Sequence, residues 1–104
     1  MSGRLGVAAL AAEVNTVVYT AGASAVTVNV LMCNRGTEAA AVNVALVNGD
    51  AAALTDADYV EYGVSLPPNG VLERSGLVMS AGESVVVWSD KDTVSARVNG
   101  YTEE

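Results

Sequence analysis

The stretch Ser24–Asn34, which reads SAVTVNVLMCN, decides the fold class of this chain. From Val26 to Met32 every second residue is apolar, and the polar residues Thr27 and Asn29 stand between them. Side chains alternate between the two faces of a β-strand, so this period of two predicts a strand with one face in a core. Valine suits such a strand because its β-branched side chain packs well on a pleated surface.

The same alternation recurs along the rest of the chain. It is clear in Ala39–Val47 and Thr93–Asn99. Over residues 58–62 it places Tyr59 and Glu61 on one face and Tyr62 on the other. The weaker stretch Ser84–Ser89 is apolar on both faces, which indicates a strand covered on both sides. The weaker expected strands are Val14–Thr20, Asp58–Tyr62, Val71–Met79 (with Gly76 as a bulge) and Ser84–Ser89.

Turn residues separate these stretches about every 8 to 12 residues, a spacing typical of sandwiches and barrels. Pro67–Gly70 is the firmest break, and Asp50–Ala57 has room for at most one helical turn. Seven or eight short strands in this length predict an all-β fold, a single antiparallel β-sandwich of immunoglobulin-like or jelly-roll-like type. Three Asn-Gly steps are expected at strand ends as hairpin turns, beginning at Asn48, Asn69 and Asn99.

The first residues differ from the rest, so we divide the chain into residues 1–12 and a β-sandwich domain, residues 13–104. Residues 1–12 are an N-terminal arm or an edge strand. Small apolar side chains in an arm are explained by docking on a neighbouring subunit. A first strand of the same sandwich is the alternative. The candidate subunit-contact residues are Arg4, Leu5, Val7, Ala8, Ala9 and Leu10.

The composition excludes several classes of function. Val (19) and Ala (17) supply 36 of the 104 residues, and His, Ile and Phe are absent. Without His there is no imidazole for acid–base catalysis or metal binding, and one Cys excludes an internal disulfide framework. Twelve acidic residues against five basic ones give a net charge of −7, which disfavours nucleic acid and anionic membranes as partners.

No group of residues forms a catalytic, metal or cofactor site, and we expect no enzyme activity. The carboxylate pairs Asp56/Asp58 and Asp90/Asp92 lack the surrounding ligands of a calcium loop and are interpreted as solvated turn residues. Cys33 has no histidine as a base and is interpreted as a structural cysteine. The arginines Arg35, Arg74 and Arg97 are expected to pair with carboxylates such as Glu13, Glu61 or Glu73.

The aromatic residues allow two interpretations. Tyr59, Tyr62 and Trp88 are candidate stacking residues for a sugar or another flat ligand. A core without Phe also needs large side chains, so packing in the core or at an interface is the favoured interpretation.

A series of motifs along the whole chain resembles a known family. The motifs are RLGV (4–7), VVYT (17–20), NV (29–30), CNRG (33–36), VALV (44–47), DYVEY (58–62), LPPNGVLERSGLV (66–78), SAGESV (80–85) and VSARVNGY (94–101). Together they resemble the small, β-rich structural proteins of tailed bacteriophage virions, of the marine and cyanophage type.

The resemblance implies a non-enzymatic virion protein, assembled in the host cytoplasm, that works by adhesion to other virion proteins. A capsid decoration or cement protein is the leading expectation, with the major capsid protein or other virion proteins as partners. A homo-oligomer is expected, with a trimer favoured. A tail, neck or fibre-attachment protein is the first alternative, and a carbohydrate-binding module is the second.

Overall fold

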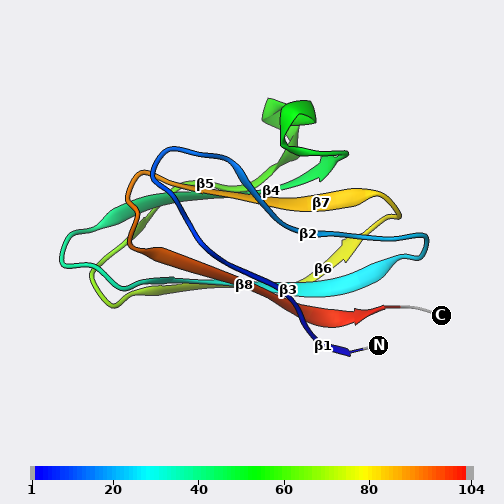
Figure 1. Ribbon diagram of the computed structural model, residues 1–104, viewed down its shortest axis with the longest axis horizontal. Helices are drawn as coiled ribbons and strands as arrows, with labels where there is room; N and C mark the ends of the chain where they lie inside the picture. The colour runs from blue at the N-terminus through cyan, green and yellow to red at the C-terminus, as the bar shows by residue number, and fades with distance from the viewer. Residues whose placement is uncertain (1, 103–104) are drawn as a thin grey trace.

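The segments with alternating valines form eight strands. These strands form two four-stranded antiparallel sheets packed face to face (Figure 1). The computed structural model describes residues 2–102. Within them the only helical segments are two 3-10 turns, η1 (Ala51–Ala53) and η2 (Asp56–Asp58), so the predicted all-β sandwich is confirmed. The strands are β1 (Ser2–Ala9), β2 (Thr16–Thr20), β3 (Val26–Asn34), β4 (Ala40–Asn48), β5 (Tyr59–Leu66), β6 (Val71–Met79), β7 (Glu83–Ser89) and β8 (Val94–Thr102).

The strand order is that of a jelly roll. One sheet, the β1 sheet, has the order β1-β8-β3-β6, and the other, the β2 sheet, has the order β2-β7-β4-β5. The first strand therefore pairs with the eighth, the second with the seventh, the third with the sixth and the fourth with the fifth. An immunoglobulin-like sandwich keeps its first two strands in one sheet. Here β1 and β2 lie in different sheets, which selects the jelly-roll alternative.

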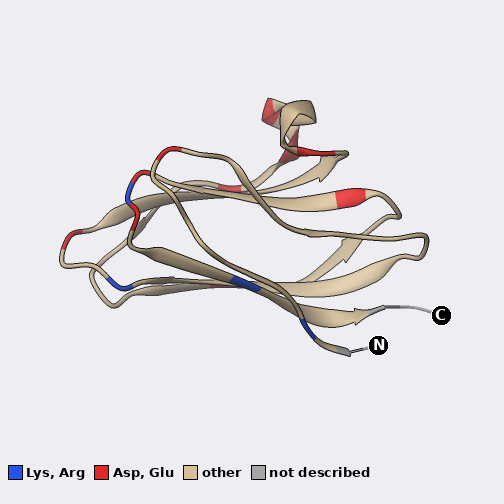
Figure 2. Ribbon diagram, in the orientation of Figure 1, with Lys and Arg blue, Asp and Glu red and all other residues tan. Residues whose placement is uncertain are grey.

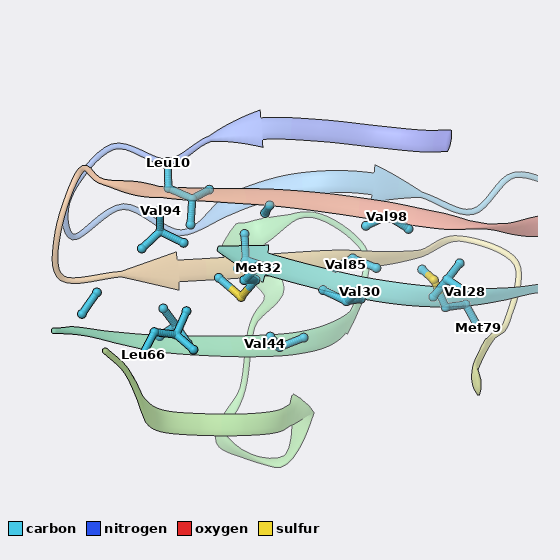
Figure 3. Packing of buried hydrophobic residues seen from close by; sticks show 14 of the residues in the cluster. Leu10, Val28, Val30, Met32, Val44, Leu66, Met79, Val85, Val94 and Val98 are labelled. Carbon is cyan, nitrogen blue, oxygen red and sulfur yellow. The ribbon is translucent and has the colours of Figure 1, made fainter. Parts of the chain in front are cut away.

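Valine fills most of the space between the sheets (Figure 3). The apolar face of β3 points into this space, and Val28 and Met32 are at most 1% exposed. Val44 and Val85 meet them from the β2 sheet. At about 25 cal/mol per Å² of apolar area removed from water, this burial is the main stabilising term. The core is thus built from small and medium side chains without aromatic residues at its centre.

A second, smaller apolar cluster covers the outer face of the β2 sheet. Val86 of β7 and Ala45 and Val47 of β4 point outward, away from the main core. The segment with η1 and η2 folds over them, and Leu54 and Tyr59 pack on this outer cluster (Figure 1). The prediction that the strand over Ser84–Ser89, now β7, is covered on both faces is therefore confirmed.

Two glycine bulges shape the outer faces of the sheets. Opposite Asn43 the strand β5 has two residues where one is expected, and Gly63 there has a φ of 67°. Opposite Asn29 the strand β6 has the same irregularity, and Gly76 has a φ of 72°. The bulge expected at Gly76 is confirmed. Such bulges need glycine because a side chain is strained at positive φ.

A second register shift in β5, where Tyr59 and Glu61 pair with the adjacent residues Ala45 and Val44, overturns the predicted alternation over residues 58–62. Tyr59 and Tyr62 lie on the same outer face, with ring centroids 4.8 Å apart. Glu61 turns toward the other sheet, where its Oε2 lies 3.0 Å from Nη1 of Arg74 on β6. Strands β5 and β6 are both sheet edges, so this ion pair closes one open side of the sandwich. Within residues 2–102 this is the one expected arginine–carboxylate pair that forms.

Asn34 fastens the turns at one end of the sandwich. Its side chain is fully buried, and its Nδ2 donates to the carbonyl oxygens of Glu38 at 2.8 Å and Leu66 at 3.0 Å. Its Oδ1 accepts from Gly36 N at 3.0 Å and from Thr93 Oγ1 at 2.8 Å. One side chain thus joins segments that lie far apart in the sequence.

One expected turn is wrong. Asn99 and Gly100 lie inside β8 and do not end a strand. A Cβ at Gly100 would come 2.1 Å from the carbonyl oxygen of Thr27 on β3. The glycine is therefore required by the close approach of two strands, whereas Asn69, with a φ of 63°, occupies a true turn between β5 and β6.

Residues 2–9 form β1, the edge strand beside β8, which is the second of the two expected arrangements of the N-terminal segment. Leu5 and Ala8 pack against the core. Leu10, which follows the strand, is 3% exposed, and its N–H donates to Val94 O at 2.9 Å. Leu10 is therefore a core residue of this chain, and its expected role as a subunit contact is wrong.

Candidate functional site

An apolar groove of about 680 Å³ crosses the outer face of the β1 sheet. We call it the apolar groove. The strand register aligns its residues in two rows across the four strands in the order β1, β8, β3, β6. The first row is Ala9, Ser95, Cys33 and Val71, and the second is Val7, Arg97, Leu31 and Glu73.

The shape of the apolar groove follows from the sizes of these side chains. Ser95 is short and lies on an inner strand, Ala9 is short and lies beside it on β1, and Val7 of β1 and Val71 of β6 stand at the two edges. Val7 is 55% exposed and Val71 is 73% exposed, which is high for valines on one contiguous face. The single free cysteine, Cys33, is half-buried in the wall.

Charge is distributed unequally between the two sheets (Figure 2). Most basic residues belong to the β1 sheet and its turns, while acidic residues belong mainly to the β2 sheet and to the loops. In the apolar groove, Nε of Arg97 donates to Asn99 Oδ1 at 2.7 Å, and beside the groove Nε of Arg35 donates to Ser95 Oγ at 2.8 Å. Neither arginine forms an ion pair within residues 2–102.

The candidate contact residues at the N-terminus are divided between this groove and the core. Val7, Ala8 and Ala9 line the apolar groove. Arg4 is exposed and lies beside Asn99, next to the second row. The contact surface also includes residues of β3, β6 and β8 that sequence reasoning missed. The sequence did indicate these residues, because Leu31, Cys33 and Val71 are apolar at positions where the alternation predicts a side chain that faces solvent.

The three candidate stacking residues meet on the opposite face of the molecule. Tyr59 and Tyr62 of β5 and Trp88 of β7 line one hollow of about 300 Å³ on the outer face of the β2 sheet. We call it the aromatic pocket. Asn15, Asn43 and Gly63 complete its lining, and a neighbouring hollow of about 380 Å³ extends past the tyrosines to Asp56.

The tyrosine pair is held in a fixed geometry. The two rings meet edge to face, with an interplanar angle of 76°. Tyr59 is half-buried against the outer cluster, whereas Tyr62 is 71% exposed. Edge-to-face contact adds about 1 kcal/mol to the burial of two aromatic rings, so Tyr59 keeps the exposed ring in place.

Asn43 lines this pocket, although sequence reasoning assigned no role to it. It lies directly opposite Trp88 in the register of β4 and β7, and it is 9% exposed. Its Oδ1 accepts a hydrogen bond from Gly63 N at 2.7 Å. No acceptor within residues 2–102 pairs with its Nδ2. The signal in the sequence was a carboxamide between two core valines, Val42 and Val44.

One member of each carboxylate pair accepts a hydrogen bond from a backbone N–H. Asp58 Oδ2 accepts from Thr55 N at 2.8 Å, and Asp90 Oδ1 accepts from Ala41 N at 2.8 Å. Within the described part of the chain no group of three or more acidic or cysteine side chains is placed to hold a metal ion.

No helix among the described residues is long and apolar enough to cross a membrane. Comparisons with family models, with curated proteins and with solved structures found no match for this chain.

Proposed function

We propose that this chain is a non-enzymatic structural protein of a tailed-bacteriophage virion, most specifically a capsid decoration or cement protein. The observation that carries the proposal is the apolar groove, in which exposed valines of β1 and β6 and half-buried apolar side chains of β3 form one face. Contiguous exposed apolar surface of this kind marks an interaction site. The motif resemblance supplies the virion context, and jelly rolls occur in viral capsid domains, although a fold by itself does not imply a function.

The partner is a surface of another virion subunit, apolar at its centre and acidic at its rim, with the major capsid protein as the expected subunit. Val, Ala and Ser lose little side-chain entropy on docking, so a groove lined by them binds at low ordering cost. Arg97 lies in the groove and Arg35 beside it, and both are held by hydrogen bonds to β8. Their charge complements an acidic rim and sets the orientation of docking.

Two exposed valines on the same strand give a matched test. Val71 lines the apolar groove, while Val78 is 69% exposed on the same face of β6 outside it. Val71→Asp is expected to lower binding to particles assembled without this protein by at least tenfold, and Val78→Asp is expected to bind like wild type. Co-sedimentation with the particles measures both. Equal binding by wild type and both variants overturns the role of the groove.

Copy number separates the capsid from the tail. A protein on the capsid surface is present in roughly hundreds of copies per particle, and one in the tail, neck or fibre base in roughly six to eighteen. Quantitative mass spectrometry of purified particles measures this number. Light scattering of the free protein tests the expected trimer, and a trimer abolished by Val71→Asp assigns the groove to a second copy of this chain instead.

A further inference from the structure

We propose that the aromatic pocket binds a neutral saccharide, with a sugar ring stacked on Tyr62 and a sugar oxygen hydrogen-bonded to Nδ2 of Asn43. The pocket lies on the β2 sheet and the apolar groove lies on the β1 sheet. This binding site is therefore independent of the proposed contact with other virion subunits.

The exposed ring of Tyr62 is the stacking platform. A tyrosine side chain that is 71% exposed leaves one aromatic face open to solvent, and the C–H face of a sugar is the apolar surface that fits it. The contact with Tyr59 holds the ring, and Tyr59 is itself held by the outer cluster. A platform that is ordered before binding loses little entropy when the ligand arrives.

The carboxamide of Asn43 provides a directional hydrogen bond for the sugar. Gly63 N–H needs an acceptor, which assigns Oδ1 to that side and turns Nδ2 away from it. Asn43 is nine-tenths buried and lines the pocket, so its two N–H donors have access only there. No buried side-chain nitrogen or oxygen of the described residues lacks a partner, so the Nδ2 of Asn43 is open to solvent in the pocket, where a hydroxyl or ring oxygen of a sugar can accept a hydrogen bond from it.

The bulge opens the backbone to the ligand. A Cβ built at Gly63 meets no atom within 4 Å, so the strand presents bare backbone between Tyr62 and Asn43. Trp88 faces Asn43 from the neighbouring strand and forms the opposite wall. The pocket therefore combines two aromatic walls with a central polar group, the composition expected of a small-ligand site.

The charges select a neutral ligand. The lining residues of the pocket include no lysine or arginine, and Asp56 lies in the adjoining hollow beside both tyrosines. A phosphate, sulfate or uronate group is repelled there, while the carboxylate of Asp56 accepts hydrogen bonds from sugar hydroxyls. The two hollows together extend the site beyond a single ring, toward an oligosaccharide.

Nuclear magnetic resonance tests the proposal with uniformly ¹⁵N-labelled protein. The probes are neutral oligosaccharides of glucose, galactose, mannose and N-acetylglucosamine, with a sulfated oligosaccharide as the charged comparison. We expect at least one neutral probe to shift the side-chain NH₂ of Asn43, the indole N–H of Trp88 and the amide of Gly63 in a saturable way. The sulfated probe is expected to leave them unchanged.

Two tyrosine variants locate the site. Tyr62→Ala is expected to weaken binding of the responding sugar by about tenfold. Tyr101→Ala is the matched control, because Tyr101 is 51% exposed on the β1 sheet, and it is expected to bind like wild type. No shift with any neutral probe, or equal binding by both variants, overturns the proposal. A proline-rich peptide that shifts the same signals while the sugars do not overturns it as well.

Discussion

Oδ1 of Asn43 accepts a hydrogen bond from the backbone N–H of Gly63 at 2.7 Å, and it does so across a bulge between two strands. The other sheet contains the same arrangement, in which Oδ1 of Asn29 accepts from Gly76 N at 3.0 Å. In each case the bulge removes the backbone acceptor that the glycine N–H would have in a regular sheet, and the asparagine Oδ1 takes its place. The paired devices bend β5 and β6, the two edge strands on the same side of the sandwich.

Replacing either bulge glycine is expected to destabilise the fold by about 1 kcal/mol, because an alanine at positive φ is strained. Gly63→Ala and Gly76→Ala isolate this effect, since a Cβ at either position meets no atom within 4 Å. Gly22→Ala is the matched control, with the same open space and no positive φ. Urea denaturation measures all three. A loss as large in Gly22→Ala contradicts the backbone explanation.

Asn34→Ala is expected to cost about 3 kcal/mol of unfolding free energy, because it leaves one buried and two part-buried backbone groups without this partner. The carbonyl oxygens of Glu38 and Leu66 and the N–H of Gly36 depend on this side chain. Asn48→Ala, at an exposed strand end, is expected to change stability by less than about 0.5 kcal/mol. Similar midpoints for the two variants in thermal or urea unfolding refute the role assigned to Asn34.

The ion pair between Glu61 and Arg74 is expected to contribute little to stability and more to solubility. The Arg74 side chain is 47% exposed, so solvent screens the pair, and a double-mutant cycle should give a coupling of about 0.5 kcal/mol. Charges that point inward at sheet edges also hinder edge-to-edge association. The double variant Glu61→Val/Arg74→Val is expected to stay folded but to associate as its concentration rises. Light scattering that shows unchanged monodispersity contradicts this.

Cys33 allows the apolar groove to be blocked chemically. It is the only cysteine and lies half-buried in the groove wall. Coupling a bulky maleimide there is expected to abolish binding to virus particles while leaving sugar binding in the aromatic pocket unchanged. Circular dichroism checks that the labelled protein stays folded. Cys33→Ser treated with the same reagent is the control, and it should bind particles as the untreated variant does.

The strands were predictable where one face is buried and the backbone is regular. In β3 and β4 the period of two assigned both the strand and its inner face, because burial imposes that period. In β5 the period failed, since a register shift between Tyr59 and Glu61, the partners of Ala45 and Val44, adds a residue and turns Tyr62 to the face that Tyr59 occupies. A bulge depends on the partner strand, and the local sequence does not reveal that partner.

The candidate site was predictable in its residue types and only partly in its positions. The aromatic residues were named from their chemistry, but the approach of Trp88 to the tyrosines is set by the pairing of β4 with β5 and β7. The strand order has the same origin. Alternation states which face of a strand is buried and leaves open which strand lies beside it. Asn99 shows the reverse error, a turn signal used inside a strand.

The pairing of the first strand with the last has a consequence for synthesis of the protein. In the β1 sheet Ser2 lies opposite Tyr101, so β1 cannot pair until β8, the last of the eight described strands, has been synthesised. Contacts between distant segments slow folding because a long loop must close before they form. Until β8 emerges, β1 has no partner in its sheet, and its apolar residues stay accessible to chaperones. The β1 sheet is therefore completed only after β8 has emerged.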